Sequence, residues 1–250
     1  MRTVRLIYRG VRLVQIILVF LIRTSFASLK RRAELTHIYS AKLLHLFNIN
    51  VTVTGSGELS NLEPCLILSN HLSYLDILML TSVRPSLFLS HKGIEREPLI
   101  GRIATHGGTL FVNRASKSKL ELEMKRFAAM LQDGNTVTLF PEGTTGDGSG
   151  IMPFHSSFIG AAILADKPVL PICIEYTALN GEAITPKNKS SVFIYGNASF
   201  LGHIKNIFLR EESMRVNIHV FERIPIGNAN RKEISSAARE MIMGTFKVIE

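Results

Sequence analysis

The chain has 250 residues, of which 46% are hydrophobic and 20% are charged. This composition supplies enough apolar side chains for one sizeable core and shows no sign of a disordered chain. The formal net charge of +9 would suggest a nucleic-acid partner if the basic side chains covered the whole surface.

The positive charge is concentrated in the first 33 residues, which contain eight basic side chains and no acidic one. Residues 34–250 carry the other 21 basic side chains and all 20 acidic ones, a net charge of +1. Because the body of the chain is electrically balanced, we expect no nucleic-acid partner.

The two cysteines, Cys65 and Cys173, lie in separate apolar segments. Their number and separation indicate neither a disulfide framework nor a cysteine-based metal cluster. The zinc-protease, serine-hydrolase and P-loop signatures are absent from the sequence as well. We expect two buried, reduced thiols, which favours a site that faces a reducing compartment. We also expect that the protein needs neither a metal nor a bound cofactor.

Residues 2–22 have the periodicity of an amphipathic helix. At 100° per residue, Arg2, Arg5, Arg9 and Arg12 fall within an arc of about 80°. The uncharged run 13–22 would cover only about half of a hydrocarbon layer roughly 30 Å thick. We therefore expect a helix that lies in or inserts into the membrane interface, with its arginines contacting anionic phosphates, and disfavour a simple spanning helix.

A secretory signal peptide and an ordinary helix docked on the domain are the alternatives for this segment. Ser25 and Ala27 would suit a signal peptide, whereas Arg9 and Arg12 extend the charged part beyond a typical start. The next segment, 33–48, is also amphipathic. We expect residues 1–50 to form a basic helical hairpin for membrane association and residues 51–250 to form the catalytic domain.

From residue 51 onward, short apolar runs alternate with helical stretches, which is the pattern of an α/β domain. We expect a central mixed, largely parallel sheet flanked by helices. The expected strands are 51–54, 65–69, 87–90, 109–112, 136–140, 169–174, 192–195 and 215–221. The expected helices in the body are 74–83, 98–105, 117–132, 157–165 and 231–246.

The most informative segment reads LILSNHLSYLDILML, residues 66–80, an apolar strand followed by a polar loop and an apolar helix. His71 and Asp76 would be about 140° apart on one continuous helix. If Ser73 caps the helix, His71 stays in the loop and Asp76 becomes the third helical residue. The carboxylate can then meet the imidazole, an arrangement typical of a general base. The alternative is a plain helix cap in which His71 is a bystander.

This segment resembles the first motif of the glycerolipid acyltransferase family, which contains the lysophosphatidic acid acyltransferases. The family pattern Asn-His-x-Ser-x-x-Asp is matched by Asn70, His71, Ser73 and Asp76. The resemblance implies that His71 is the base and Asp76 its partner, and that the acceptor attacks an acyl thioester directly, without an acyl-enzyme.

A second block, GTLFVNR, resembles the family's second motif and ends in Arg114. The planar guanidinium of an arginine at a strand end suits a phosphate. Lys92 stands where the family often has a lysine, and we expect it to be an accessory anion contact. Solvated surface positions are the alternative for both side chains.

The string FPEGT, residues 140–144, is the most specific match to the family. A glycine turn after a strand lets N–H groups converge on an oxyanion or phosphate. The resemblance implies that Glu142 orients acceptor hydroxyls and that Gly143 and Thr144 line the substrate site. A tight turn with a solvated glutamate is the alternative.

The last block, VLPICIEY, resembles the fourth motif and contains Pro171. The resemblance implies that this proline shapes the end of the strand and borders the acyl channel. Any edge strand could also contain such a proline.

Two departures from the family pattern concern the acceptor. Thr145 stands where many members have an arginine, and His155 stands in a segment where many have a lysine. Both differences argue against a doubly charged phosphomonoester.

Taken together, the resemblance implies an O-acyltransferase that moves a fatty acyl group from acyl-CoA or acyl carrier protein to the hydroxyl of a lysolipid. 1-Acyl-sn-glycerol-3-phosphate, giving phosphatidic acid, is the first acceptor it implies. Lyso-ornithine lipid or another lysophospholipid is the alternative. The chain would act on an anionic membrane surface, at the cytoplasmic face of the inner membrane. A metal-dependent hydrolase and a non-catalytic lipid-binding protein on the same fold are the rival functions.

Overall fold

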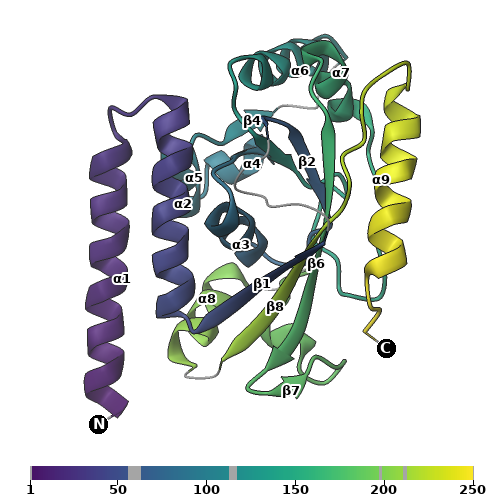
Figure 1. The fold of residues 1–250 in the computed structure, drawn as a ribbon. Coiled ribbons are helices and arrows are strands. Elements are labelled where there is room, and N and C mark those ends of the chain that lie inside the picture. Colours follow the sequence, from purple (N-terminus) through teal and green to yellow (C-terminus); the bar gives the residue numbers. More distant parts are fainter. Residues whose placement is uncertain (1, 56–62, 113–116, 197–198, 211–212, 250) are drawn as a thin grey trace.

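The structure, a computed structural model, describes residues 2–55, 63–112, 117–196, 199–210 and 213–249. Strands and helices alternate after two N-terminal helices (Figure 1). The strands are β1 (Ile49–Gly55), β2 (Leu66–Ser69), β3 (Leu87–His91), β4 (Leu110–Val112), β5 (Val137–Leu139), β6 (Val169–Leu179), β7 (Glu182–Ala183) and β8 (Met214–Val220). The helices are α1 (Arg2–Thr24), α2 (Leu29–Leu46), α3 (Leu75–Val83), α4 (Lys92–Glu95), α5 (Ile100–His106), α6 (Lys117–Gln132), α7 (Gly160–Ala165), α8 (Phe200–Leu209) and α9 (Arg231–Thr245), with 3-10 turns η2 (Ser157–Ile159) and η3 (Lys189–Ser191).

The sheet has the strand order β1-β8-β6-β2-β5-β3-β4, and β7 pairs with the end of β6. Pairing is parallel except between β6 and β8 and between β6 and β7. The expected mixed, largely parallel sheet is therefore confirmed. Because β2 lies beside β5 in parallel, the loops that follow these two strands leave the same edge of the sheet, the usual place for a site in such folds.

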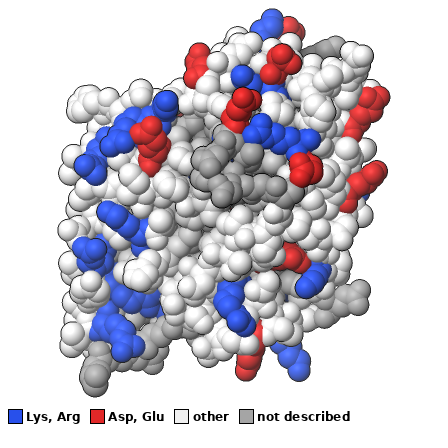
Figure 2. Space-filling view, in the orientation of Figure 1, with Lys and Arg blue, Asp and Glu red and all other residues white. Residues whose placement is uncertain are grey.

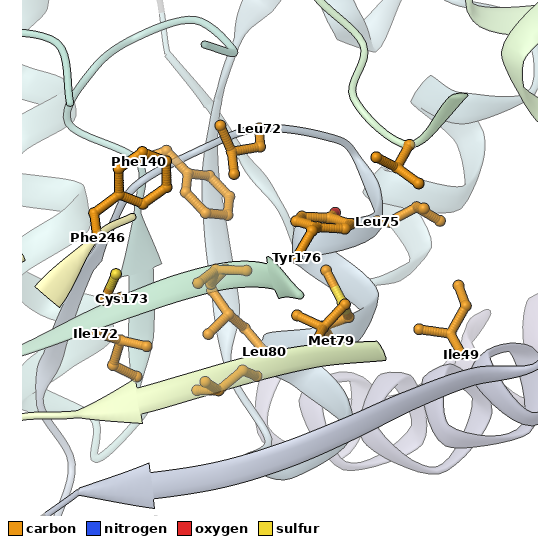
Figure 3. Close-up of a cluster of buried hydrophobic side chains, with 14 of the residues drawn as sticks. Ile49, Leu72, Leu75, Met79, Leu80, Phe140, Ile172, Cys173, Tyr176 and Phe246 are labelled. Carbon is orange, nitrogen blue, oxygen red and sulfur yellow. The ribbon is translucent and has the colours of Figure 1, made fainter. Parts of the chain in front are cut away.

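The core lies on both faces of the sheet, as the alternation of side chains along β2 requires. Ile67 belongs to the cluster that includes α3, α8 and the end of α9, whereas Leu66 and Leu68 belong to the cluster with α6 and α7. Figure 3 shows the first cluster, in which α3 packs over the sheet. All three β2 side chains are almost fully buried, so the strand that precedes the predicted catalytic loop is fixed from both sides.

The two N-terminal helices form the expected antiparallel hairpin, with α2 packed on α3 and α1 outermost (Figure 1). A small cluster of Ile16, Phe20, Leu35 and Tyr39 holds α1 against α2. Basic side chains predominate on this flank, whereas both signs are mixed elsewhere on the same face (Figure 2). Among the described residues, no helix combines the length and the apolarity that a membrane crossing requires.

One side of α1 exposes a row of large apolar side chains, here named the apolar face of α1. It consists of Val4, Ile7, Tyr8, Val11, Val14, Leu18 and Ile22, all more than half exposed. At 100° per residue, Arg5, Arg12 and Arg23 fall within about 20° of one another along one margin of this row. Apolar residues with a flanking cationic margin are the pattern of an interfacial helix.

Arg9 does not join this margin, contrary to the expectation that all the early arginines reach phosphates. Its side chain is buried, lies over the ring of Phe208 and donates a hydrogen bond from Nη1 to the carbonyl of Arg210 at 2.6 Å. The helical periodicity explains this difference, because it places Arg9 on the side of α1 that carries Ile16 and Phe20 and faces the protein.

The predicted strand over 192–195 is wrong, because Val192 lies in a turn after η3 and residues 193–195 belong to no helix or strand. The side chains of Val192 and Phe193 are buried in the hydrophobic core, which explains why this segment is apolar. α4 and α8 were not expected. α8 begins at a cap in which Ser199 accepts a hydrogen bond from the N–H of Gly202.

Candidate active site

The loops after β2 and β5 meet as the parallel pairing requires. The N–H of Gly146 donates to the carbonyl of His71 at 2.8 Å, which joins the turn after β5 to the loop after β2. The side chains of His71 and Phe140 are stacked, with ring centroids 3.9 Å apart and planes inclined by 9°. Two segments about 70 residues apart in the sequence thus form one site.

The predicted contact between His71 and Asp76 is present. His71 Nδ1 lies 2.8 Å from Asp76 Oδ2, and the same oxygen accepts hydrogen bonds from the N–H groups of Leu72 and Ser73 at 2.7 and 2.9 Å. The Asp76 side chain is fully buried, whereas that of His71 is 16% exposed. Within the described parts of the chain, Nε2 of His71 has no hydrogen-bond partner, so it is the ring nitrogen available to a substrate.

Ser73 lies one residue before the N-cap position instead of at it, although its Oγ still accepts a hydrogen bond from the N–H of Leu75 at 3.4 Å. α3 begins at Leu75 after Tyr74, which makes no side-chain cap, and Asp76 is the second helical residue instead of the third. Asp76 itself binds the N–H groups that precede the helix, and this keeps His71 in the loop. The predicted break in the helix between His71 and Asp76 therefore exists, and the hydrogen bonds of the Asp76 carboxylate stabilise it.

Asn70 anchors this loop to the sheet. Its Oδ1 accepts from the N–H of Ile174 at 2.7 Å and its Nδ2 donates to the carbonyl of the same residue at 2.9 Å. The amide side chain thus continues the ladder between β2 and β6 beyond Ser69, where the backbone turns away. The asparagine of the first motif has a structural function that sequence reasoning did not assign.

Glu142 is buried, and both of its carboxylate oxygens accept hydrogen bonds from the backbone. Oε1 accepts from the N–H of His71 at 2.8 Å, and Oε2 accepts from the N–H of Met152 at 2.9 Å. Burial raises the pKa of Glu142, an effect that these two bonds partly oppose. In this structure the glutamate connects three loops, and its predicted contact with acceptor hydroxyls stays a prediction.

The turn after Glu142 is glycine-dependent, since Gly143 has a φ of 77°, where a side chain would strain the backbone. Its N–H donates to the carbonyl of Phe140 at 3.2 Å. Thr144 is exposed at the tip of the turn. Gly143 is exposed as well, so both predicted substrate-lining residues of this turn are accessible to solvent.

Asp147, in the loop that follows, forms an ion pair with Lys189 of η3. Lys189 Nζ lies 3.1 Å from Asp147 Oδ2. Hydrogen bonds from Ser149, followed by the bond from Lys189, hold the pKa of Asp147 at about 2. The cation of Lys189 is thus already matched by a carboxylate.

The other predicted site residues are more scattered. Lys92 begins α4 and is exposed at the end of β3. Pro171 lies inside the central strand β6, opposite Leu68, and not at the strand end or on an edge strand. It is tolerated because the β6–β8 ladder starts only at Ile172. Arg114 lies outside the described residues.

Sequence reasoning missed Tyr176. Its hydroxyl donates to Asp76 Oδ1 at 2.6 Å, and its side chain is buried. The residue ends the VLPICIEY block, but nothing in the local pattern indicated a contact with Asp76, 100 positions away.

Across the described residues there is no group of three potential metal-binding side chains.

The Acyltransferase family model matches residues 50–175, half of the chain. This chain belongs to the acyltransferase family. The resemblance of its motifs is thereby confirmed, and the chain is an acyltransferase of the lysolipid-acylating group.

Two relatives and one solved structure illustrate the breadth of the family. The lyso-ornithine lipid O-acyltransferase of Pseudomonas aeruginosa is 30% identical over 97% of the acyltransferase described here and 93% of its own length. The 1-acyl-sn-glycerol-3-phosphate acyltransferase of Neisseria gonorrhoeae is 35% identical over 44% of each chain. The crystal structure of the 1-acyl-sn-glycerophosphate (LPA) acyltransferase, PlsC, from Thermotoga maritima shares the fold, with a TM-score of 0.67, 16% identity and coverage of 98% and 95%.

Proposed function

We propose that this acyltransferase moves a fatty acyl group from acyl-CoA or acyl carrier protein to the free hydroxyl of a lysolipid, with His71 as the general base. The observation that carries the proposal is the 2.8 Å contact of His71 Nδ1 with a fully buried Asp76, which leaves Nε2 beside the Phe140–Gly143 turn. A carboxylate on Nδ1 fixes the tautomer in which Nε2 can accept a proton.

In the proposed reaction, the acceptor oxygen attacks the thioester carbonyl while Nε2 takes the hydroxyl proton. Asp76 stabilises the imidazolium that forms. Collapse of the tetrahedral intermediate breaks the C–S bond, and Nε2 returns the proton to the departing thiolate. The products are an ester and a free thiol, and His71 is neutral again.

We propose lyso-ornithine lipid as the preferred acceptor, which reverses the order implied by the motifs alone. The relative matched over nearly its full length acts on that lipid, according to its name. Thr145 and His155 replace expected cations, and Lys189 is neutralised by Asp147. A zwitterionic head group suits such a balanced loop better than a phosphate dianion does, because the dianion needs unmatched cations. Lysophosphatidic acid is the second candidate, on the similarity to the Neisseria enzyme.

An acceptor panel tests this choice. The purified protein is given labelled palmitoyl-CoA, or the same acyl group on acyl carrier protein, with equal amounts of lyso-ornithine lipid, lysophosphatidic acid or lysophosphatidylethanolamine. We expect kcat/KM for lyso-ornithine lipid to exceed that for lysophosphatidic acid by about 10-fold or more, the effect of one charge-assisted contact. A preference for lysophosphatidic acid would contradict the choice of acceptor, and no transfer to any lysolipid would contradict the proposed function.

We also propose that the apolar face of α1 lies on the anionic cytoplasmic face of the inner membrane. Seven apolar side chains in one row, with Arg5, Arg12 and Arg23 along one margin, support this placement. Insertion would remove the apolar row from water, and each arginine near an anionic leaflet would add about 1 kcal/mol.

Replacing Val11, Leu18 and Ile22 together by serine should weaken binding to vesicles of phosphatidylethanolamine and phosphatidylglycerol by about 100-fold or more, since each side chain loses its burial in the bilayer. Vesicle co-sedimentation measures the effect. The matched control replaces Leu122 on α6 and Leu164 on α7, which are also more than half exposed but lie away from α1. Equal losses in the two variants would refute the placement.

A further inference from the structure

Asp76 has two carboxylate oxygens, and they have different partners. Oδ2 accepts from His71 Nδ1 and from two backbone N–H groups of the same loop. Oδ1 accepts from the hydroxyl of Tyr176 at 2.6 Å. The local loop therefore binds one side of the carboxylate, and β6 binds the other.

We propose that Tyr176 is a positioning residue for acyl transfer, because its hydroxyl fixes the orientation of the carboxylate that holds His71. This inference rests on the proposed function of His71 and Asp76. Tyr176 does not contact the substrate in this scheme, since its side chain is buried, close to Leu75 at the start of α3 (Figure 3).

The hydroxyl of Tyr176 donates to Asp76 and is also hydrogen-bonded to the side chain of Ser73. Burial, together with the adjacent charge of Asp76, raises the pKa of the phenol well above its ordinary value. The phenol therefore stays protonated over the whole range in which the enzyme can work. A short hydrogen bond from this donor is directional, so it holds Oδ1 of Asp76 in one position.

The sheet places this hydroxyl by two devices. Asn70 clamps the catalytic loop to Ile174, two residues before Tyr176 on the same face of β6. A β-bulge follows directly, since the register with β8 shifts between Tyr176 and Ala178, and bulges beside active sites re-aim side chains. The ring itself packs edge-to-face on Phe193, with centroids 5.1 Å apart.

Without the hydroxyl, Oδ1 of Asp76 would be a buried acceptor with no donor among the described residues. The carboxylate could then rotate about its Cβ–Cγ bond and exchange the oxygen that faces His71. The imidazole would lose its fixed orientation in the transition state, whereas the sites that bind the lysolipid and the thioester would be unchanged. The expected consequence is a loss in kcat with little change in KM.

The test is the kinetics of Tyr176→Phe, which keeps the ring on Phe193 and removes only the hydroxyl. We expect kcat to fall about 10- to 100-fold with KM within about twofold for both substrates, because second-layer hydrogen bonds to catalytic groups have effects of this size. In an Asp76→Asn background the same substitution should change kcat by about twofold or less, because two residues that act as a unit have non-additive effects.

Two controls separate positioning from packing. Tyr74→Phe removes another partly buried hydroxyl, which contacts His203 Nδ1 at 3.1 Å instead of Asp76, and should leave kcat within about twofold of the wild type. Phe193→Leu loosens the packing around Tyr176 but keeps the hydroxyl donor, and should lower the Tm more than it lowers kcat.

Three results would each overturn the inference. The first is a wild-type kcat in Tyr176→Phe, and the second is an equal fold loss of kcat when this substitution is made with Asp76 and with Asp76→Asn. The third is a Phe193→Leu variant that shows the same kinetic defect. A Tyr176→Phe protein that does not fold would overturn it too, since Tyr176 would then be structural. If the wild-type protein acylates no lysolipid, the proposed function fails instead, and the two failures are distinguishable.

Discussion

The variant His71→Ala is expected to lose acyl transfer and to keep its fold and its membrane binding. Removing the general base should lower kcat/KM by about 10²- to 10⁴-fold. The Asp76 carboxylate would keep the N–H groups of Leu72 and Ser73 and the hydroxyl of Tyr176 as partners. The free energy of unfolding should therefore fall by only about 1 kcal/mol, the usual contribution of one hydrogen bond. Transfer of labelled palmitate to lyso-ornithine lipid, and thermal unfolding, measure the two effects.

The matched control is His45→Ala, which removes an exposed histidine at the end of α2, away from the loops of the site. It should retain wild-type turnover. If His71→Ala also retains turnover while it binds vesicles normally, the proposed base is wrong. A non-catalytic lipid-binding protein would bind lysolipid equally well in the wild type and both variants and would show no transfer in any of them.

Substitutions of Asp76 should separate charge from structure. Asp76→Ala leaves four donors without their acceptor: His71 Nδ1, the N–H groups of Leu72 and Ser73, and the hydroxyl of Tyr176. A buried network broken on one side loses about 3–5 kcal/mol, so we expect a large drop in unfolding free energy as well as loss of activity. Chemical denaturation followed by circular dichroism measures the first effect.

Asp76→Asn keeps the shape and one carbonyl acceptor but removes the charge. Its stability loss should be less than half that of Asp76→Ala, while kcat should still fall by about 10²- to 10⁴-fold, because the imidazolium loses its counter-ion. A suitable comparison is Asp133→Asn, a change at an exposed carboxylate after α6. An active Asp76→Asn enzyme would show that the aspartate only caps the helix, the alternative left open by the sequence.

Elements with strong local signals agree well with the expectations from sequence. The helix expected at 117–132 has those bounds, and the helix expected at 231–246 runs from Arg231 to Thr245 after a capping box between Asn230 and Glu233. The periodicity of both helices and the cap of the last one act within a few residues. The strand expected at 192–195 is absent because an apolar run alone does not specify a strand. Val192 and Phe193 fill the core beside Tyr176, and the backbone of this segment bonds to Lys189 and Leu72 instead of to a neighbouring strand.

The motifs pointed to the family and to the pairing of His71 with Asp76, because both lie within one loop and one helical turn. Sequence reasoning assigned the cap to Ser73 and gave Glu142 a substrate-facing function. In the structure Asp76 itself stabilises the break, and Glu142 binds backbone N–H groups of two loops. These contacts depend on the relative position of β2 and β5, which no local pattern encodes.

The sequence by itself therefore determined the α/β class, the basic amphipathic N-terminus and the histidine–aspartate pair, since each depends on residue spacing within a single element or loop. Only the tertiary structure decided that Arg9 turns inward, that Pro171 lies in a central strand, and that Tyr176 binds Asp76. Contacts such as the last one join residues 100 positions apart. They arise only when strand order and register bring two segments together, and strand order is a property of the whole sheet.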